Sequence, residues 1–289
     1  MPDWSILFEQ LEVEGVHVSP GTLATPVSGG DISAAWRLTS SNGDLFIKTG
    51  PSSAENMFAA EAEALAELAR PGSLRVPRVI ATGQRGALAY LALEWLCLEA
   101  ADAKVEGLMG EQLAELHRTT SDRYGWHRDN MIGLTPQINT WDEKWIDFYR
   151  EHRLAFQLRL AADRGFGADL KDRGSRLLKR LPIYFDNAKP LASMLHGDLW
   201  GGNWGSCDGR PVIYDPALYY GDRETDIAMT RLFGGFGVAF YDAYEAAWPL
   251  SDGHEERQHL YQLYHVLNHL NLFGSGYLGR AIGLMDKLL

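Results

Sequence analysis

The strongest constraint on the fold is a change of pattern along the chain, from strands to helices. Strand-like segments predominate up to Trp95, whereas the segments after Ala100 are typical of helices, with little strand except near "PVIYD". Two regions of such different character favour two lobes with a cleft between them. We therefore predict an α+β fold with an N-terminal lobe at residues 1–95 and a C-terminal lobe at residues 96–289.

Turn residues and apolar segments divide the front region into strands and one long helix. The segments "AAWRLTS" and "GDLFIKTG" are predicted to be neighbouring strands, because Asn42-Gly43 between them is a strong hairpin signal. A helix rich in alanine, glutamate and leucine is predicted over residues 54–69, where Pro71-Gly72 then ends it. Two more strands follow in "VPRVIATG" and "GALAYLALEWL", and helices are predicted in "GLMGEQLAELHR" and over residues 141–160 and 255–272.

Charge and composition narrow the range of partners. The net charge is −11, from 38 acidic and 27 basic residues, which argues against nucleic acid or an anionic membrane as the main partner. No apolar run approaches the ~18 residues of a membrane span, and the start "MPDWSILFEQ" carries acids where a secretory signal needs positive charge. Cys97 and Cys207 are too few for a disulfide framework. We expect a cytoplasmic protein with reduced thiols, of open oligomeric state.

Residues 195–205 read "LHGDLWGGNWG" and hold the first candidate site. Asp198 and Asn203 lie five residues apart on a predicted loop and can therefore converge on one point. Phosphoryl transfer uses such a pair, because a carboxylate accepts the hydroxyl proton and an amide oxygen holds a metal ion. Gly201 and Gly202 would let the loop bend without steric conflict. Taken alone, the segment is also compatible with a turn whose polar groups are satisfied.

A second acid follows at Asp215, where the strand-like segment "PVIY" ends. Mg²⁺ prefers oxygen ligands and substrate phosphates, which fits one aspartate and one asparagine. The alternative is that Asp215 only caps a turn before Pro216. With Asp198 nearby, we interpret Asn203 and Asp215 as ligands of Mg²⁺.

Candidates for phosphate binding lie upstream, in the order that a nucleotide site requires. Lys48 is on a predicted strand, and thirteen residues later the helix offers Glu61, with Glu63 as the alternative partner. A Lys–Glu pair that orients the α- and β-phosphates is a requirement of kinases. Before Lys48, "VSGGDISAAWRL" places two glycines between strand-like segments, where N–H and hydroxyl groups can face phosphate oxygens. The candidates there are Ser28, Gly29, Gly30 and Ser33.

Other catalytic motifs fail when they are checked against the sequence. His254 and His259 in "HEERQH" are five residues apart, where a zinc-binding helix face requires four. The chain has no G-x-x-x-x-G-K loop, no G-x-S-x-G turn and no complete dinucleotide fingerprint. His265 and His269 are four residues apart on a predicted helix, and we expect a pair in the core or the cleft rather than a metal site.

The loop at 195–205 resembles the H-x-D-x-x-x-x-N catalytic loop of protein-kinase-like folds. Over a longer span, the chain resembles the fructosamine kinase (ketosamine-3-kinase) family, within the aminoglycoside-phosphotransferase-like kinases. The resemblance is carried by "HGDLWGGNWG", "YDPALYYGDRETDIAMTRLFGGF" and "LYQLYHVLNHLNLFGSGY", together with "NMFAAEAEAL" after Lys48 and "GWHRDNMIG" at 125–133. These segments cover nearly the whole chain.

The resemblance implies a two-lobed, protein-kinase-like enzyme that uses ATP and Mg²⁺ to phosphorylate the 3-hydroxyl of ketosamines, the products of glycation. Phosphorylation makes the adduct unstable, so that the amine is released and the glycation is repaired. By resemblance, Asp198 is the catalytic base, Asn203 and Asp215 hold Mg²⁺, and Lys48, fixed by Glu61, positions the phosphates. Adenine would pair with backbone groups of the segment that joins the lobes, at Glu94, Trp95 and Leu96.

Several positions need separate interpretation. Trp200 stands where protein kinases usually carry a lysine, and it is the candidate wall for the sugar. Asp222 stands where the family commonly has histidine, so its role is open. Asp226 is expected to anchor the catalytic loop by hydrogen bonds, and Arg223 and Glu224 are expected to be structural.

Two other functions remain open on the sequence. A kinase of the same fold could act on another hydroxyl compound, such as an aminoglycoside or an amino sugar, and the acidic charge suits either cationic substrate. A non-catalytic nucleotide-binding module is disfavoured, because Lys48, Asp198, Asn203 and Asp215 are all intact, whereas a degenerate binder should have lost at least one of them. The sequence does not separate a free ketosamine from one on a protein side chain, nor fructosamine from ribulosamine.

Overall fold

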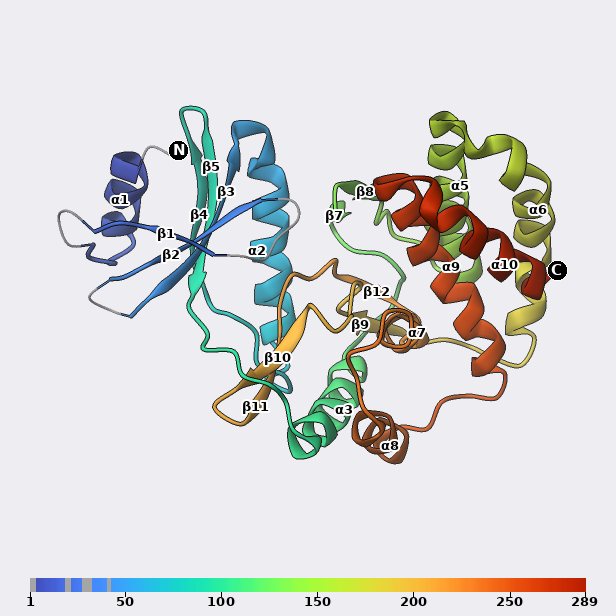
Figure 1. The fold of residues 1–289 in the computed structure, drawn as a ribbon. Coiled ribbons are helices and arrows are strands. Elements are labelled where there is room, and N and C mark those ends of the chain that lie inside the picture. The colour runs from blue at the N-terminus through green and yellow to red at the C-terminus, as the bar shows by residue number, and fades with distance from the viewer. Residues whose placement is uncertain (1–3, 19–21, 28–32, 41–42) are drawn as a thin grey trace.

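The computed structural model describes residues 4–18, 22–27, 33–40 and 43–289. These residues form two lobes, a smaller one built on a sheet and a larger one that is mostly helical (Figure 1). The α+β, two-lobed class predicted from the sequence is confirmed. We propose that the lobes divide between residues 95 and 96, directly after the last strand of the sheet.

The N-terminal lobe is built on one antiparallel sheet of five strands, in the order β1-β2-β3-β5-β4. The predicted hairpin is confirmed, because β2 pairs with β3 in a register that places Ala35 opposite Lys48. Its predicted turn residue Asn42 lies outside the described residues. The strands are β1 (Thr25–Val27), β2 (Ala34–Leu38), β3 (Leu45–Pro51), β4 (Val79–Arg85) and β5 (Leu88–Glu94).

A helix covers each face of this sheet. On one face, α1 (Trp4–Val13) brings Leu7 and Leu11 into a buried cluster with Ile47 of β3. On the other face, α2 (Glu55–Ala69) packs Phe58 into a cluster that includes Leu91 of β5. Because β5 is buried on both faces, its sequence is an almost continuous apolar run.

Helix α1 was not predicted, although its apolar residues recur at helical spacing. The predicted helix over 54–69 is confirmed as α2, which begins after a single 3₁₀ turn at Ser52–Ala54.

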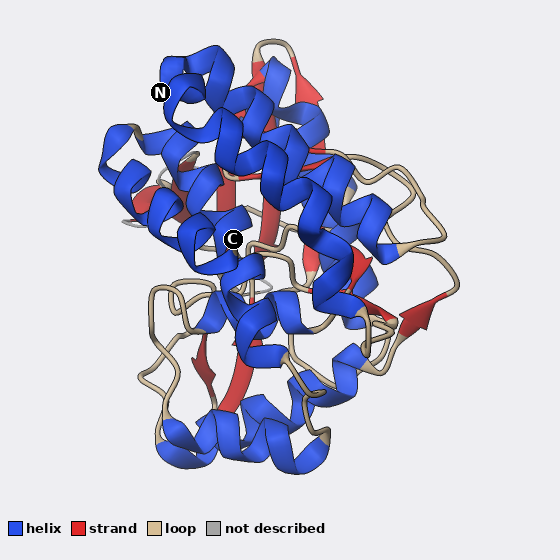
Figure 2. Ribbon diagram, turned by 90° about the vertical axis from the view of Figure 1, so that its right-hand side faces the viewer, coloured by secondary structure: helices blue, strands red, loops and turns tan. Residues whose placement is uncertain are grey.

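The C-terminal lobe consists mainly of helices, as Figure 2 shows from the side of that lobe. The predicted helix over 141–160 begins at Trp145 and passes through a π-helical stretch at Tyr149–Ala155. A second π-helical stretch spans Ala162–Phe166, and short 3₁₀ helices span Leu181–Phe185 and Ser275–Tyr277. The α-helices are α3 (Ala103–His117), α4 (Trp145–Phe148), α5 (Phe156–Ala161), α6 (Gly167–Arg180), α7 (Glu224–Thr230), α8 (Val238–Ala247), α9 (His254–Phe273) and α10 (Leu278–Leu288). Within the described ranges, every helix is too short or too polar to cross a bilayer.

The C-terminal lobe also contains more strand than the sequence indicated. Strand β11 (Arg210–Ile213) was predicted, but six further short strands were missed, because runs of two to four residues carry almost no periodic signal. They form one three-stranded sheet, β12-β9-β6, and two hairpins, β10-β11 and β7-β8. The missed strands are β6 (Thr120–Ser121), β7 (Asn130–Ile132), β8 (Thr135–Gln137), β9 (Ala192–Leu195), β10 (Trp204–Cys207) and β12 (Tyr219–Gly221).

One hydrophobic cluster joins the lobes. Phe58 and Leu65 of α2 belong to the same buried cluster as Leu113 of α3 and Ile132 of β7. Helix α2 therefore packs on the second lobe as well as on its own sheet, which fixes the position of its polar face.

Helices α3 and α8 approach closely at Gly110, where a β-carbon would lie 2.2 Å from the Phe240 carbonyl oxygen. We predict that Gly110→Ala lowers the free energy of unfolding by about 3 kcal/mol, because backbone rather than a flexible side chain must move. Gly107→Ala is the matched control, since it lies in the same helix with nothing within 4 Å of the added carbon. This control should raise stability by about 0.5–1 kcal/mol through helix propensity. Urea unfolding of both variants measures the difference, and equal effects would contradict the close approach.

Candidate active site

Strand alternation directs Lys48 toward the second lobe. In β3 the neighbours Ile47 and Thr49 are buried, and Ile47 faces the cluster around α1, so that Lys48 points to the opposite face. Its Nζ lies 2.7 Å from Glu61 Oε1 and 2.7 Å from Asp215 Oδ1. Burial by itself would lower the pKa of Lys48, but the two carboxylates outweigh it and raise this pKa. The ammonium group is therefore charged and joins α2 to the segment after β11.

Helix geometry separates the two glutamates that the sequence offered as partners of Lys48. Glu61 is the residue that contacts the lysine. Glu63, two residues later and about 200° further around the helix, instead accepts hydrogen bonds from Arg128 Nη1 at 2.6 Å and His127 Nε2 at 2.9 Å. Glu63 therefore ties α2 to the loop after Gly125, in the C-terminal lobe.

The carboxylate of Asp226 anchors the loop that follows β9. Asp226 of α7 accepts hydrogen bonds from the backbone N–H groups of His196 at 2.8 Å and Gly197 at 2.9 Å. Its Oδ2 is also 3.2 Å from His117 Nε2. Burial alone would raise the pKa of Asp226, but these hydrogen bonds and nearby histidines lower it. The predicted anchoring role of Asp226 is confirmed.

His196 connects this loop to the segment after β11 that carries Asp215. Its Nε2 lies 2.9 Å from the Tyr214 carbonyl oxygen, and its Nδ1 accepts the N–H of Asp198 at 3.2 Å. Burial lowers the pKa of His196, so the ring is neutral and its tautomer follows from these two contacts. The backbones of Asp198 and Tyr214 are thereby held at a fixed separation.

The glycine that bends the loop is not one of the predicted pair. Gly197 has φ 83° and a β-carbon there would lie 2.0 Å from the Ala217 carbonyl oxygen. This position therefore requires glycine on both conformational and steric grounds. Gly201 and Gly202 do not have positive φ, and they serve close approach instead. A β-carbon would lie 2.9 Å from Gly235 Cα at the first and 2.4 Å from the Trp200 ring at the second.

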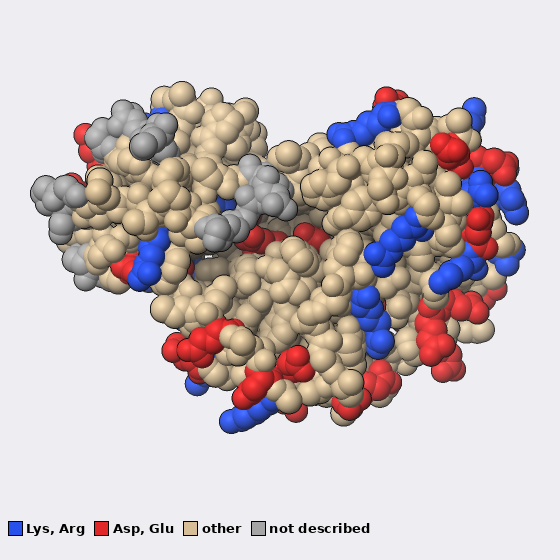
Figure 3. Space-filling view, in the orientation of Figure 1, with Lys and Arg blue, Asp and Glu red and all other residues tan. Residues whose placement is uncertain are grey.

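Asp198, Asn203 and Asp215 lie together at the end of this loop. Asn203 Nδ2 is 2.9 Å from the Asp198 carbonyl oxygen, 3.4 Å from Asp198 Oδ2 and 3.4 Å from the Asp215 carbonyl oxygen. Burial, helped by the charges of Asp215 and Asp226, raises the pKa of Asp198 to about 7. Asp215 itself has φ 57°, an uncommon conformation for a residue other than glycine and one that clusters at functional sites. Figure 3 shows acidic side chains at the base of the hollow between the lobes.

The oxygen atoms here suit a hard divalent cation. Asp215 has one carboxylate oxygen on Lys48 and a second, Oδ2, that makes no hydrogen bond within the described ranges. Asn203 Oδ1 likewise accepts no hydrogen bond from any described residue, because its amide nitrogen faces Asp198. Within the described part of the chain, no three His, Cys, Asp or Glu side chains are grouped as a metal site. A cation with two protein ligands fits Mg²⁺, which completes its shell with phosphates and water.

The remaining candidates are only partly described. Ser28, Gly29 and Gly30 lie outside the described residues, and Ser33 directly precedes β2. In the connection between lobes, the N–H groups of Glu94 and Trp95 already donate to the Arg78 and Asp44 carbonyl oxygens. The backbone N–H and C=O groups of Leu96 have no hydrogen-bond partner in the described structure, so in this segment they are free to bind a ligand.

Trp200 lies within the loop of residues 195–205, with 40% of its surface exposed, and its ring packs edge-on against that of Phe233, with ring centroids 6.4 Å apart. Phe233 in turn contacts the ring of His269 at 4.7 Å. An aromatic surface thus begins next to Asp198 and continues onto α9.

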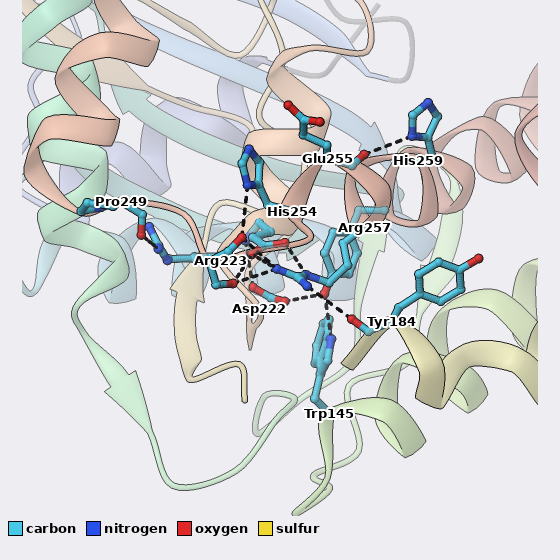
Figure 4. A network of polar contacts seen from close by, with 12 residues as sticks. Trp145, Tyr184, Asp222, Arg223, Pro249, His254, Glu255, Arg257 and His259 are labelled. Atoms are coloured by element: carbon cyan, nitrogen blue, oxygen red, sulfur yellow. Dashed lines mark hydrogen bonds and ion pairs between the residues drawn. The ribbon is translucent and has the colours of Figure 1, made fainter. Parts of the chain in front are cut away.

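Asp222, Arg223 and Glu224 belong to a buried network that supports α7 (Figure 4). Asp222 accepts hydrogen bonds from Tyr261 and from the backbone N–H of Glu224. Burial and the charge of Glu224 raise the pKa of Asp222 to about 7. Glu224 pairs with Arg257 at 2.8 Å, and Arg223 donates to the Trp248 carbonyl oxygen at 2.8 Å. The predicted structural roles of Arg223 and Glu224 are confirmed, and these contacts place Asp222 in the same network.

We predict that Asp226→Asn lowers the free energy of unfolding by about 2–3 kcal/mol. An amide offers one acceptor oxygen in place of two, so one loop N–H would face an NH₂ group in a buried site. Asp242→Asn, on the exposed side of α8, is the control and should change stability by less than about 0.5 kcal/mol. Urea unfolding monitored by circular dichroism measures both variants. An unchanged midpoint for Asp226→Asn would contradict the anchoring role.

Comparison with known proteins places this geometry in context. The family model described as fructosamine kinase matches residues 6–289. A probable ketoamine kinase from Synechocystis sp. is 42% identical over 265 residues, which cover 91% of this chain and 89% of the relative. A chloroplastic protein-ribulosamine 3-kinase from Oryza sativa subsp. indica is 40% identical, covering 93% and 79%. The crystal structure of a putative fructosamine-3-kinase from Haemophilus somnus superposes with a TM-score of 0.90 at 29% identity, covering 99% and 97% of the two chains.

Proposed function

The chain belongs to the fructosamine kinase family and is a phosphotransferase, and we propose that it transfers the γ-phosphate of ATP to the 3-hydroxyl of ketosamines. The acceptor class and the position follow the names of its relatives, ketoamine kinase and protein-ribulosamine 3-kinase. One observation carries the proposal for this chain itself. Lys48, Glu61 and Asp215 converge from both lobes, and Asn203 links Asp215 to Asp198.

In the proposed reaction, the acceptor hydroxyl oxygen attacks the γ-phosphorus while the bond to the β–γ bridging oxygen breaks. ADP leaves, and the hydroxyl proton passes to the carboxylate of Asp198. Lys48, held by Glu61, positions the α- and β-phosphates. Mg²⁺, when held by Asn203 and Asp215, neutralises charge on the phosphates. Because the transition state is loose, positioning and charge stabilisation account for most of the catalysis.

The other site residues have proposed roles at the edges of this centre. Ser28, Gly29, Gly30 and Ser33 would offer N–H and hydroxyl groups to the phosphates. Adenine would pair with the backbone between Glu94 and Leu96, where the free groups of Leu96 support the assignment. Trp200 would form a wall for the sugar. A cytoplasmic location, and function without a nucleic-acid or membrane partner, stay predictions from the sequence.

An acceptor assay tests this function. Purified protein, ATP and Mg²⁺ are incubated with a fructosyl-amine or a ribulosyl-amine, and ADP release and the phosphorylated position are followed by coupled assay and NMR. We expect a 3-phosphorylated ketosamine. Asp198→Ala is the control for contaminating kinases, and it should lower the rate at least about 100-fold while ATP affinity stays nearly unchanged.

The assay separates the alternatives. Turnover of aminoglycosides or amino sugars without turnover of ketosamines would favour a kinase of the same fold with another acceptor. ATP binding without transfer to any hydroxyl compound would favour a nucleotide-binding module. Loss of ATP affinity in Asp198→Ala would contradict the role of this residue as base.

We predict different effects for the two neighbouring glutamates of α2. Glu61→Gln removes the charge that holds Lys48 and should lower kcat/KM for ATP by about 10–100-fold. Glu63→Gln breaks a contact whose glutamate is 47% exposed, so kcat/KM should change by less than about threefold. Initial rates at varied ATP measure both. A larger loss in Glu63→Gln than in Glu61→Gln would contradict the assigned partner of Lys48.

A further inference from the structure

His265 differs from the other fully buried histidines of the described chain. It lies on α9 with 1% of its surface exposed, and neither ring nitrogen has a hydrogen-bond partner among the described residues. His117, equally buried, contacts Tyr244 Oη at 2.9 Å and Asp226 at 3.2 Å. A buried donor left without a partner costs about 1–3 kcal/mol, so a phenylalanine at position 265 would be less costly than histidine. Core packing therefore does not explain this residue.

The position of the ring supplies an explanation. Nδ1 of His265 lies 4.0 Å from Oδ1 of Asp198. This distance is too long for a hydrogen bond, and the N–H needs to approach by about 1 Å to make one. The other carboxylate oxygen of Asp198, Oδ2, lies 3.4 Å from the Asn203 amide. The two carboxylate oxygens of Asp198 thus face different partners. Oδ2 already accepts a hydrogen bond from Asn203, whereas Oδ1 has none from His265.

The surroundings keep this imidazole neutral. Burial, with contributions from His269 and Arg153, lowers the pKa of His265 to about 3. Arg153 is itself fully buried, with its guanidinium 4.0 Å from the centre of the Tyr219 ring. His269 is turned away, with Nδ1 2.8 Å from the His265 carbonyl oxygen. A neutral ring has one N–H to donate, and it neither supplies nor takes up a proton in the reaction.

We propose that His265 is a positioning residue that donates its Nδ1–H to Asp198 Oδ1 in the reacting complex and so fixes the plane of the catalytic carboxylate. Hydrogen bonds of catalytic groups are often long before substrates bind and shorten in the complex. With Oδ1 held by His265 and Oδ2 by Asn203, the carboxylate presents a fixed lone pair to the acceptor hydroxyl. The inference rests on the proposed function of Asp198 as base.

The test uses His265→Phe in the full-length protein. We expect kcat to fall at least about 10-fold, because an unoriented base loses part of its positioning advantage. KM for ATP should stay within about twofold, since His265 does not contact the nucleotide side of the site. The melting temperature should stay the same or rise, because the unpartnered nitrogens are removed. His265→Asn, whose amide can replace the Nδ1–H donor, should recover most of kcat.

Two further variants make the result decisive. His117→Phe is the matched control for a buried histidine with both nitrogens bonded, and its melting temperature should fall by several degrees. His265→Leu introduces a side chain smaller than phenylalanine. It therefore separates the effect of losing the N–H donor from the effect of overpacking. Unchanged kcat in both His265→Phe and His265→Leu would overturn the proposal. So would a fall in melting temperature in both as large as that of His117→Phe.

The outcome for His265 is distinct from the outcome for the proposed function. If the unsubstituted protein phosphorylates no ketosamine, the proposed function fails. The melting temperatures of His265→Phe, His265→Leu and His117→Phe then still test the premise of the inference, that the unpartnered nitrogens of His265 cost stability in the free protein, because they need no acceptor. If the unsubstituted protein is active and His265→Asn is as slow as His265→Phe, the proposed donor role fails while the function stands.

Discussion

The arrangement of the two lobes depends on the ion pairs of the buried Lys48 ammonium group with Glu61 and Asp215. A charge in a partly dehydrated site needs compensating partners, and here they come from different parts of the chain. Glu61 is on the helix of the N-terminal lobe, and Asp215 follows a strand of the C-terminal lobe. The same three groups therefore join the two lobes, and in the proposed mechanism they position the phosphates.

The loop of residues 195–205 is held in place by contacts with residues outside it. Its backbone N–H groups are bonded to Asp226, and its histidine spans to the Tyr214 carbonyl oxygen. Gly197 packs so closely on Ala217 that no side chain fits between them. Such support holds reacting groups in place before substrates arrive, and this is the main contribution a protein makes to phosphoryl transfer.

Buried polar groups in the C-terminal lobe fall into two kinds. In many of them the polar atoms are paired, as the contacts of Glu224 with Arg257 and of Asp226 with His117 show. In others a polar atom has no hydrogen-bond partner in the described structure, and His265, next to Asp198, has both ring nitrogens unpaired there. A buried polar group without a partner lowers the stability of the free protein, and other contacts offset this loss. Such losses are typical of functional sites, where a side chain finds its partner only when substrates are bound.

The sequence alone determined the fold class, the β2–β3 hairpin, helix α2 and the set of polar residues that meet at the site, because alternation, helical spacing and motif order are local properties. The prediction that Glu61 is the partner of Lys48 is confirmed. Only the tertiary structure decided that Gly197 rather than Gly201 or Gly202 makes the bend, and that His265 faces Asp198. Helix α1 and the short strands were likewise missed. These outcomes depend on how segments distant in the chain pack together, which sets the direction of a side chain and the space around a backbone atom in a way that residue spacing does not.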